Sequence, residues 1–263
     1  MAVGLFTAVL VHRGVRYRLR QLKCAACPSA LPSADVTLDA STSADVDAIA
    51  TCVRAHGVCC VHNFFGAAQV EEWGAEVRRL RELDRATSVR NRNTGRSEYN
   101  FDPHAPPFAR TAAGSVLADE RLVLVFKRLL GAKVRVETAG SVFAEPGAVA
   151  QRWHQDVPHL FTTGAHLPAH FIAAFVPLCE LTRVNGPTEF RVGSHVKANV
   201  VRAPQELVLT CPLGSVVLFD GRVFHRGGAN GSGCAREVLF VNVCRHWYRD
   251  MSNKVENRLE QLL

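Results

Sequence analysis

The first part of the chain carries apolar residues at helical spacing, one every three to four positions. In the segment "STSADVDAIATCVRAHG", Thr42 or Ser43 can cap a helix and Gly57 ends it. A second helix is predicted over residues 66–84, after the short buried strand "VCCVHNF". We expect the apolar stripes to face the core: Val46, Ile49, Ala50 and Val53 in the first helix, and Val70, Trp73, Val77, Leu80 and Leu83 in the second.

Residues 85–114 show no periodicity and are rich in Asn, Gly, Pro and Arg. They predict long loops, which either face a substrate or simply connect two elements at the surface. The pattern leaves both interpretations open. A third helix is predicted over residues 115–131, where Gly131 stops it.

From Lys133 onward the pattern changes to short runs rich in β-branched and aromatic residues, separated by turn residues. The runs are "KVRVETAGSVFAE", "AQRWHQDV", "AHFIAAFVPL", "TEFRVGS", "SVVLFD", "RVFHRG" and "REVLFVNVCR". They predict an antiparallel double-sheet core such as a jelly roll. Because helices come first and strands follow, the fold class is α+β, with the N-terminal helices packed on the β core. The last residues, "NKVENRLEQLL", predict a short closing helix.

No long linker divides the chain, so we predict a single domain over residues 41–263 after an N-terminal extension, residues 1–40. Residues 1–34 hold five basic residues and no acidic one, which is compatible with an organellar targeting segment. A plain extension or an opening strand is the alternative. Nine cysteines, an odd number, do not indicate a disulfide framework, and the Cys24–Cys27 motif lacks the second pair of a zinc site. This favours a reducing intracellular compartment, cytoplasmic or organellar.

The composition narrows the possible partners. The chain has 263 residues, 48% of them hydrophobic and 21% charged, as is typical of a globular protein. No apolar run reaches the roughly 20 residues of a membrane span. The net charge is +7, but the basic residues are scattered among acidic ones. The sequence also lacks the aromatic signature of an RNA-binding module, so we expect no nucleic-acid partner. The sequence leaves the oligomeric state open.

One short segment, "QRWHQDVPHLF", carries candidate metal ligands. On a strand, the spacing of His154 and Asp156 points both side chains to the same face. A buried histidine and a buried carboxylate need a partner, and a metal ion is a good one. His225 follows about 70 residues later, on a predicted strand just after a tight Asp220–Gly221 turn.

Two histidines and one carboxylate form the facial triad of non-haem Fe(II) oxygenases, which leaves open positions on the iron. A 2-oxo acid can occupy two of these through its carboxylate and keto oxygen, and dioxygen can occupy a third. The far carboxylate of the acid then needs a buried cation. Arg236 stands eleven positions after His225, and two antiparallel strands joined by a Gly-rich turn would bring their side chains together. A guanidinium binds a carboxylate through two hydrogen bonds.

The motifs "WHQD", "NGPTEFRVGSH" and "GSVVLFDGRVFHRGGAN…REVLF" resemble those of the phytanoyl-CoA dioxygenase family of Fe(II)/2-oxoglutarate oxygenases, and the resemblance covers residues 44 to about 248. It implies a double-stranded β-helix core, with dioxygen as a substrate and ascorbate as a reductant. It also implies C–H hydroxylation of a small organic or acyl-CoA substrate, with release of succinate and CO2. The implied site residues are His154, Asp156 and His225 as iron ligands, Arg236 as the carboxylate anchor, and Gln151 and Thr188 as cosubstrate contacts.

Several alternatives stay open at this point. Gln151 and Thr188 can instead stabilise turns, and the histidines near the metal pair can shape a substrate pocket or be structural. A jelly-roll protein that binds a metal or small molecule without turnover is a second hypothesis, and a zinc hydrolase is a third. Neither needs a distant carboxylate anchor, so Arg236 favours the oxygenase. Related halogenases replace the carboxylate ligand by a small residue, so the presence of Asp156 favours hydroxylation.

Overall fold

The computed structural model describes residues 11–12, 15–16, 36–42, 44–83, 94–161, 166–200 and 205–250. Strands β1 (Val11–His12) and β2 (Val15–Arg16) pair with each other within the unit Met1–Leu31, and all the other elements belong to the unit Pro32–Leu263. Most of the predicted targeting segment, the Cys24–Cys27 motif and the predicted closing helix lie outside the described residues.

Two β-sheets form the core of the second unit. The larger sheet contains β3 (Thr37–Asp39), β4 (Val58–His62), β5 (Arg96–Phe101), β6 (Val134–Ala144), β7 (Phe171–Pro177), β10 (Val216–Asp220) and β12 (Arg236–Arg245). Its order is β3–β4–β10–β7–β12–β6–β5, and β3 pairs parallel with β4 while the other neighbours pair antiparallel. The smaller sheet contains β8 (Thr188–Arg191), β9 (Glu206–Val208) and β11 (His225–Gly227), in the order β11–β8–β9.

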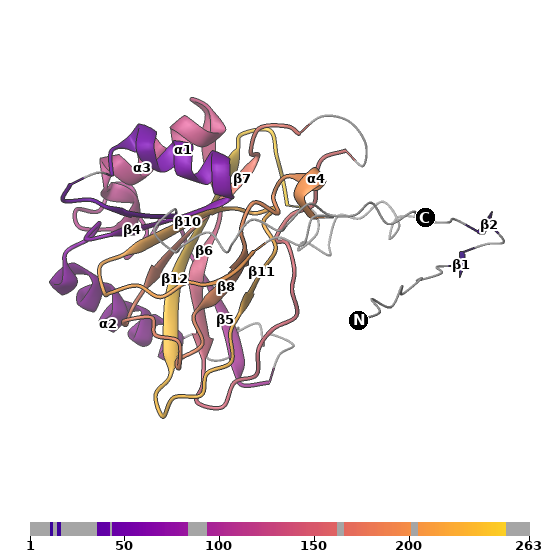
Figure 1. Cartoon of the computed structure of the whole chain (residues 1–263). Helices are drawn as coiled ribbons and strands as arrows, with labels where there is room; N and C mark the ends of the chain where they lie inside the picture. Colours follow the sequence, from indigo (N-terminus) through magenta and orange to yellow (C-terminus); the bar gives the residue numbers. More distant parts are fainter. Residues whose placement is uncertain are drawn as a thin grey trace, which may run out of the picture. The chain divides into compact units, whose positions relative to one another are not determined.

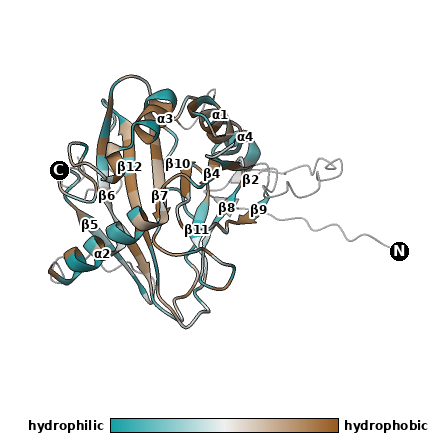
Figure 2. Ribbon diagram, turned by 90° about the vertical axis from the view of Figure 1, so that its left-hand side faces the viewer, coloured by the Kyte–Doolittle hydropathy of each residue, from teal (hydrophilic) through white to brown (hydrophobic). Residues whose placement is uncertain are grey.

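Helices cover one side of the larger sheet. They are α1 (Val46–His56), α2 (Ala67–Leu83) and α3 (Glu120–Leu130), and the one-turn helices η2 (Val116–Ala118) and α4 (Lys197–Val200) lie in connections. Figure 1 shows α1, α2 and α3 on one side of this sheet and the strands of the smaller sheet on the other. Strands that are covered on both faces carry mostly apolar residues, as Figure 2 shows for β10 and the middle of β12, and both strands are almost wholly buried. The predicted α+β fold with a jelly-roll-like core is confirmed. No described helix is both long and apolar enough to cross a bilayer.

The helix ends only partly follow the sequence prediction. The cap of α1 is Asp45, whose side chain accepts a hydrogen bond from the Ala48 N–H at 2.7 Å, so the prediction of Thr42 or Ser43 was wrong. Thr42 instead belongs to a preceding turn, in which its N–H donates to the carbonyl of Asp39. Gly57 ends the helix in the left-handed conformation, as predicted. Leu83, the last residue of α2, is 73% exposed and does not extend the buried stripe, also contrary to prediction.

Strand β5 forms within the stretch for which the sequence predicted only loops. The cavity face of β5 carries the polar residues Arg96, Glu98 and Asn100, and the strand lies at the sheet edge. Its sequence "RSEYNF" therefore begins with three polar residues. The alternation of apolar and polar residues that marks a half-buried strand covers only the last four residues. The three-residue strands β3 and β9 were also absent from the prediction, and β3 extends the sheet into the stretch predicted as an N-terminal extension.

The contact between β5 and β6 depends on Gly140, which pairs with Asn100 on β5. A Cβ atom at Gly140 would lie 1.9 Å from the carbonyl oxygen of Tyr99, an atom of the β5 backbone. We expect Gly140→Ala to lower the free energy of unfolding by about 1–3 kcal/mol or more, because the strand must move. Urea denaturation measures this. The matched control is Gly233→Ala, where an added Cβ meets no atom within 4 Å, and equal stability of the two variants would contradict the prediction.

Candidate active site

A cavity of about 460 Å³ lies between the two sheets. Residues of β5, β6, β7 and β12 line it from the larger sheet and residues of β8 and β11 from the smaller one, while residues 151–156 complete the wall. The volume is in the range of pockets that hold small molecules. The six site residues predicted from the sequence all line this cavity: His154, Asp156, His225, Arg236, Gln151 and Thr188.

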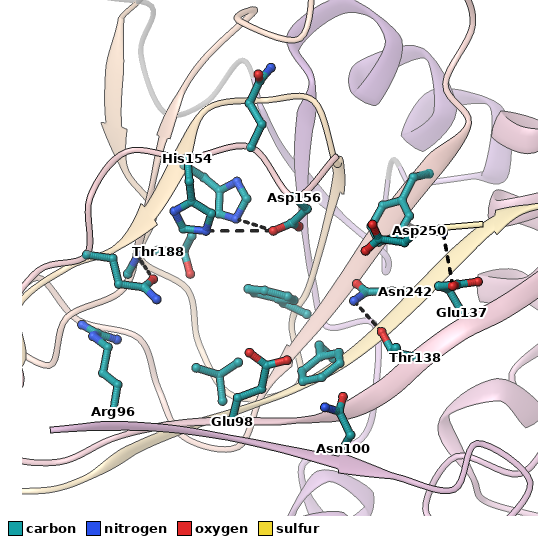
Figure 3. A pocket seen from close by; sticks show the side chains of 18 of the residues that line it. Arg96, Glu98, Asn100, Glu137, Thr138, His154, Asp156, Thr188, Asn242 and Asp250 are labelled. Atoms are coloured by element: carbon teal, nitrogen blue, oxygen red, sulfur yellow. Dashed lines mark hydrogen bonds and ion pairs between the residues drawn. The ribbon is translucent and has the colours of Figure 1, made fainter. Parts of the chain in front are cut away.

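Three of these residues bring potential metal ligands together (Figure 3). An oxygen of Asp156 lies 3.4 Å from Nε2 of His225 and 3.9 Å from Nε2 of His154. One ligand atom from each residue can be chosen so that all three lie within 4.8 Å of one another. The side chain of His225 is buried, and those of His154 and Asp156 remain partly open to the cavity. Nitrogen and oxygen donors on one side of a common point fit a facially bound metal ion.

Both imidazole rings are fixed by their own backbone. Nδ1 of His154 lies 2.9 Å from the carbonyl oxygen of Arg152, and Nδ1 of His225 lies 3.0 Å from that of Val223. A carbonyl only accepts hydrogen bonds, so each Nδ1 carries the proton. The lone pair of each Nε2 is then directed toward Asp156 and is available to a metal, as is usual for ligand histidines.

The segment that holds His154 and Asp156 is not a regular strand, although the sequence predicted one. It runs beside the segment 221–227, and the N–H groups of Gln151 and Asp156 donate to the carbonyls of Gly227 and Gly221 at 2.9 Å each. Between these bonds His154 and His225 exchange two backbone hydrogen bonds, of 3.0 and 2.9 Å, in an isolated bridge. This bridge places the two histidine ligands side by side, and a bend at residues 156–157 replaces further strand pairing.

The three residues shift one another's pKa values. Burial is the largest single effect on the pKa of His225 and acts to lower it, but the charge of Asp156 and the hydrogen bonds to Asp156 and Val223 together raise that pKa. Burial acts to raise the pKa of Asp156, but the neighbouring histidines outweigh it and hold the pKa below its usual range. Burial and the charge of His225 lower the pKa of His154. An ionised Asp156 and a neutral His154 are the forms that bind metal.

Arg236 is buried in the same cavity and forms no ion pair with the described residues. It is only 2% exposed, and neither its Nε nor its Nη2 has a hydrogen-bond partner in the described part of the chain. Burial and then the charge of Arg96 lower its pKa to about 10, so it remains a cation at neutral pH. A buried, unpaired guanidinium is costly, and an anionic ligand removes that cost.

The strand pairing that places Arg236 in the cavity differs from the prediction. Strand β11 pairs with β8, whereas β12 pairs with β6 and β7. The expected antiparallel pair of β11 and β12 was therefore wrong, because the Gly-rich turn crosses from one sheet to the other. His225 and Arg236 meet the cavity from different sheets, which leaves room between them for a ligand.

A second buried arginine, Arg96, was missed because its strand was predicted as a loop. Ala144 on β6 pairs with Arg96 on one side and with Arg236 on the other, so the two arginines rise from the same face across a small residue. Arg96 donates from Nε to the carbonyl of Val149 at 3.1 Å and from Nη2 to that of Gly228. Its Nη1 has no partner among the described residues.

Gln151 and Thr188 lie at the same end of the cavity. The amide oxygen of Gln151 accepts a hydrogen bond from the N–H of Gly227 on β11 at 2.7 Å. Thr188 is buried and pairs with Gly227 across β8 and β11. Gly227 has no room for a side chain, since a Cβ there would lie 2.6 Å from Nη1 of Arg96. The glycine leaves space for the guanidinium of Arg96 and the amide of Gln151.

The other end of the cavity is polar and acidic. Glu98 and Asn100 project from β5, two residues apart on the face that also carries Arg96. Burial and then the charge of Asp156 raise the pKa of Glu98. The remaining polar side chains at this end are Glu137, Thr138, Asn242 and Asp250, as Figure 3 shows.

The other histidines that the structure describes do not line this cavity. His159 and His166 line a separate small pocket beside Arg222. The ring of His170 lies 4.5 Å from that of Tyr248, and burial followed by the charge of Arg222 lowers its pKa to about 4. His195 contacts the carbonyl of Arg54 through Nε2 at 3.0 Å, which is a structural contact. The free cysteines among the other described residues are Cys59, Cys60, Cys179, Cys211, Cys234 and Cys244.

A jelly-roll-like core with two histidines and one carboxylate facing a cavity, and with a buried unpaired arginine in that cavity, defines the class of non-haem Fe(II) oxygenases. The chain belongs to the phytanoyl-CoA dioxygenase (PhyH) family, whose model matches residues 53–238. It is a Fe(II)/2-oxoglutarate-dependent dioxygenase.

Curated relatives and solved structures agree with this family. The chain is 26% identical over 206 residues to the Fe(II)/2-oxoglutarate-dependent dioxygenase nvfF of Aspergillus novofumigatus, covering 72% of this chain and 68% of that protein. It is 22% identical over 209 residues to the dioxygenase hkm4 of Aspergillus hancockii, covering 73% and 68%. The fold is similar to that of HygX from Streptomyces hygroscopicus, solved with nickel and 2-oxoglutarate, with a TM-score of 0.58, 17% identity and coverage of 75% and 86%. It is also similar to EctD from S. alaskensis with bound Fe, with a TM-score of 0.60, 21% identity and coverage of 74% and 75%.

Proposed function

We propose that the protein hydroxylates a C–H bond of a small organic substrate, with 2-oxoglutarate as cosubstrate. In this proposal His154, Asp156 and His225 hold Fe(II), and Arg236 binds the far carboxylate of 2-oxoglutarate. Gln151 and Thr188 shape the cosubstrate end of the cavity, and we add Arg96 to this group. The relatives nvfF and hkm4 are dioxygenases, which supports this reaction class.

The single observation that carries the proposal is the buried guanidinium of Arg236, unpaired at two nitrogens among the described residues, in the same cavity as the triad. A structural metal site has no need for a cation on the far wall of its cavity. A dicarboxylate such as 2-oxoglutarate uses both features, because one end can bind the metal and the other the arginine. The non-catalytic jelly roll and the zinc hydrolase leave Arg236 without a role.

The residues of the chain prepare the reaction by position and charge. Fe(II) with 2-oxoglutarate and dioxygen supplies the oxidising power, and 2-oxoglutarate leaves as succinate and CO2. The two backbone carbonyls that fix the histidine rings hold Nε2 of each ring toward the metal. Asp156 keeps a carboxylate at the third ligand position, which supports hydroxylation rather than halogenation. Arg236 and Arg96 orient the cosubstrate and leave the Glu98 side of the cavity for the substrate.

Anaerobic titration of the apoprotein with Fe(II) and then with 2-oxoglutarate tests the proposal. We expect a visible metal-to-ligand charge-transfer band, because the keto oxygen and carboxylate chelate Fe(II). Zn(II) in place of Fe(II) is the control, and it should give no such band. A folded protein that binds iron but never develops the band would contradict the cosubstrate role and favour non-catalytic metal binding.

Replacing Arg96 tests its part in the cosubstrate end. We expect Arg96→Met to raise the KM for 2-oxoglutarate by about 10-fold, because one charge-assisted hydrogen bond to the cosubstrate is lost. Iron binding should be unchanged, since Arg96 contacts no triad residue in the described structure. Succinate release as a function of 2-oxoglutarate concentration gives the KM. Arg191→Met on β8, where Arg191 pairs with Glu206, is the control, and an equal KM in the two variants would contradict the assignment.

A further inference from the structure

The second half of the cavity points to the class of substrate, an inference that rests on the function proposed above. We propose that Glu98 binds a protonated amine or similar cationic group of the substrate and thereby positions a neighbouring C–H bond beside the metal. The substrate is then a small polar organic cation rather than an acyl-CoA. Glu98 acts as a positioning and specificity residue.

The strand register places Glu98 between the cosubstrate end and the open half of the cavity. Arg96, Glu98 and Asn100 alternate along β5, so a cation, an anion and an amide follow one another on one face. Glu98 pairs with Val142 on β6. This pair lies two residues along the strands from Ala144, which pairs with both arginines. Figure 3 shows its side chain rising into the cavity on the side that faces the triad.

The carboxylate of Glu98 has no hydrogen bond or ion pair with any residue that the structure describes, although it is half-buried. The other acidic side chains of the cavity differ in this respect. Glu137 forms an ion pair with Arg135, and Asp156 faces the two histidines. A shielded carboxylate gains most from a cationic partner, because a charge-assisted hydrogen bond is about twice as strong as a neutral one. Glu98 is therefore positioned to bind a positively charged group of a ligand.

The surroundings of Glu98 fit a polar ligand. Asn242 donates from its amide nitrogen to the hydroxyl of Thr138 at 2.9 Å, while its amide oxygen has no partner among the described residues and can accept a hydrogen bond. Asn100 adds a further amide from β5. No lysine of the described ranges lines the cavity, and its two arginines lie at the cosubstrate end. This half of the cavity thus offers acceptors and negative charge to a substrate.

The same features disfavour an acyl-CoA. The phosphates of its coenzyme A portion would be repelled by Glu98 and the acidic end of the cavity. A cavity of about 460 Å³ is also too small to enclose both the coenzyme A portion and the acyl chain. A neutral polyol would form hydrogen bonds with the amides but would leave the charge of Glu98 uncompensated. The cation is the ligand that satisfies both the amides and the carboxylate.

The test uses the full chain loaded anaerobically with Fe(II) and 2-oxoglutarate, and three ring compounds of matched size. Calorimetry measures the binding of cyclohexylamine, cyclohexanol and cyclohexanecarboxylate. We expect the amine to bind about 10- to 100-fold more tightly than the other two, the range of one hydrogen bond between charged groups. Glu98→Gln should remove this preference, and Glu98→Lys should reverse it in favour of the carboxylate.

The outcomes separate this inference from the proposed function. The charge-transfer band must form in wild type and in Glu98→Gln, which shows that iron and cosubstrate are in place. If the band forms but the three compounds bind equally or not at all, or if the amine preference survives in Glu98→Gln, the amine site is wrong and the dioxygenase stands. Glu76→Gln on α2, where the carboxylate pairs with Arg79 outside the cavity, is the control and should keep the preference.

Discussion

We expect turnover and iron binding to be lost together when His225 is replaced by alanine. His225 is the buried member of the triad, and its Nε2 lies nearest to the oxygen of Asp156. Removing one of three protein ligands should weaken metal binding by more than the roughly 10- to 100-fold that follows from losing a group that only supports a ligand. We expect succinate formation below detection and less than one iron per chain. Iron content after gel filtration and succinate release with 2-oxoglutarate measure both effects.

His154→Ala and Asp156→Ala should show the same joint loss, since each removes one corner of the cluster. His104→Ala is the control, because His104 is an exposed histidine outside the cavity. Far-UV circular dichroism establishes that each variant is folded. A folded His225→Ala protein that keeps one tightly bound iron and normal turnover would show that the metal is held elsewhere.

The triad and its arginine could be identified from the sequence because local patterns carry them. The spacing of His154 and Asp156, the tight turn before His225 and the strand that begins at Arg236 are each readable over a few residues. The relation between them was harder to predict. An antiparallel hairpin was the simplest path from His225 to Arg236, but the turn changes sheets, and short-range pattern does not show in which sheet a strand pairs.

Three of the cavity residues that were missed lie on one strand. Arg96, Glu98 and Asn100 belong to β5, whose six residues begin with three polar ones, so only the last four show a period-two pattern. Its partner β6 begins more than thirty residues later, so no turn between neighbouring strands marks the pair. A strand of this kind contributes charge to a cavity rather than apolar area to a core. Hydrophobic patterns detect strands that pack against the core, and they are weak for a strand whose side chains line a polar cavity.

Arg236→Ala should separate cosubstrate binding from metal binding. Arg236 lies on the wall of the cavity away from the triad, so iron content should stay near that of the wild type. The affinity for 2-oxoglutarate should fall about 100-fold or more, because truncating one partner of a buried charge pair commonly costs about 2–5 kcal/mol. Titration of the charge-transfer band with 2-oxoglutarate measures the dissociation constant. Arg128→Ala on α3 is the control, since that arginine pairs with Asp47 at the surface.

The stability of the same site gives an independent readout. Without ligand, Arg236 is a buried cation with two nitrogens unpaired among the described residues, so Arg236→Met should be at least as stable as wild type in the absence of 2-oxoglutarate. With iron and 2-oxoglutarate present, the wild-type Tm should rise through ligand binding, whereas that of Arg236→Met should rise much less. A purely structural arginine would show the opposite, a loss of stability that is the same with and without the cosubstrate. Equal thermal shifts and equal 2-oxoglutarate affinities in the two proteins would exclude the anchor role.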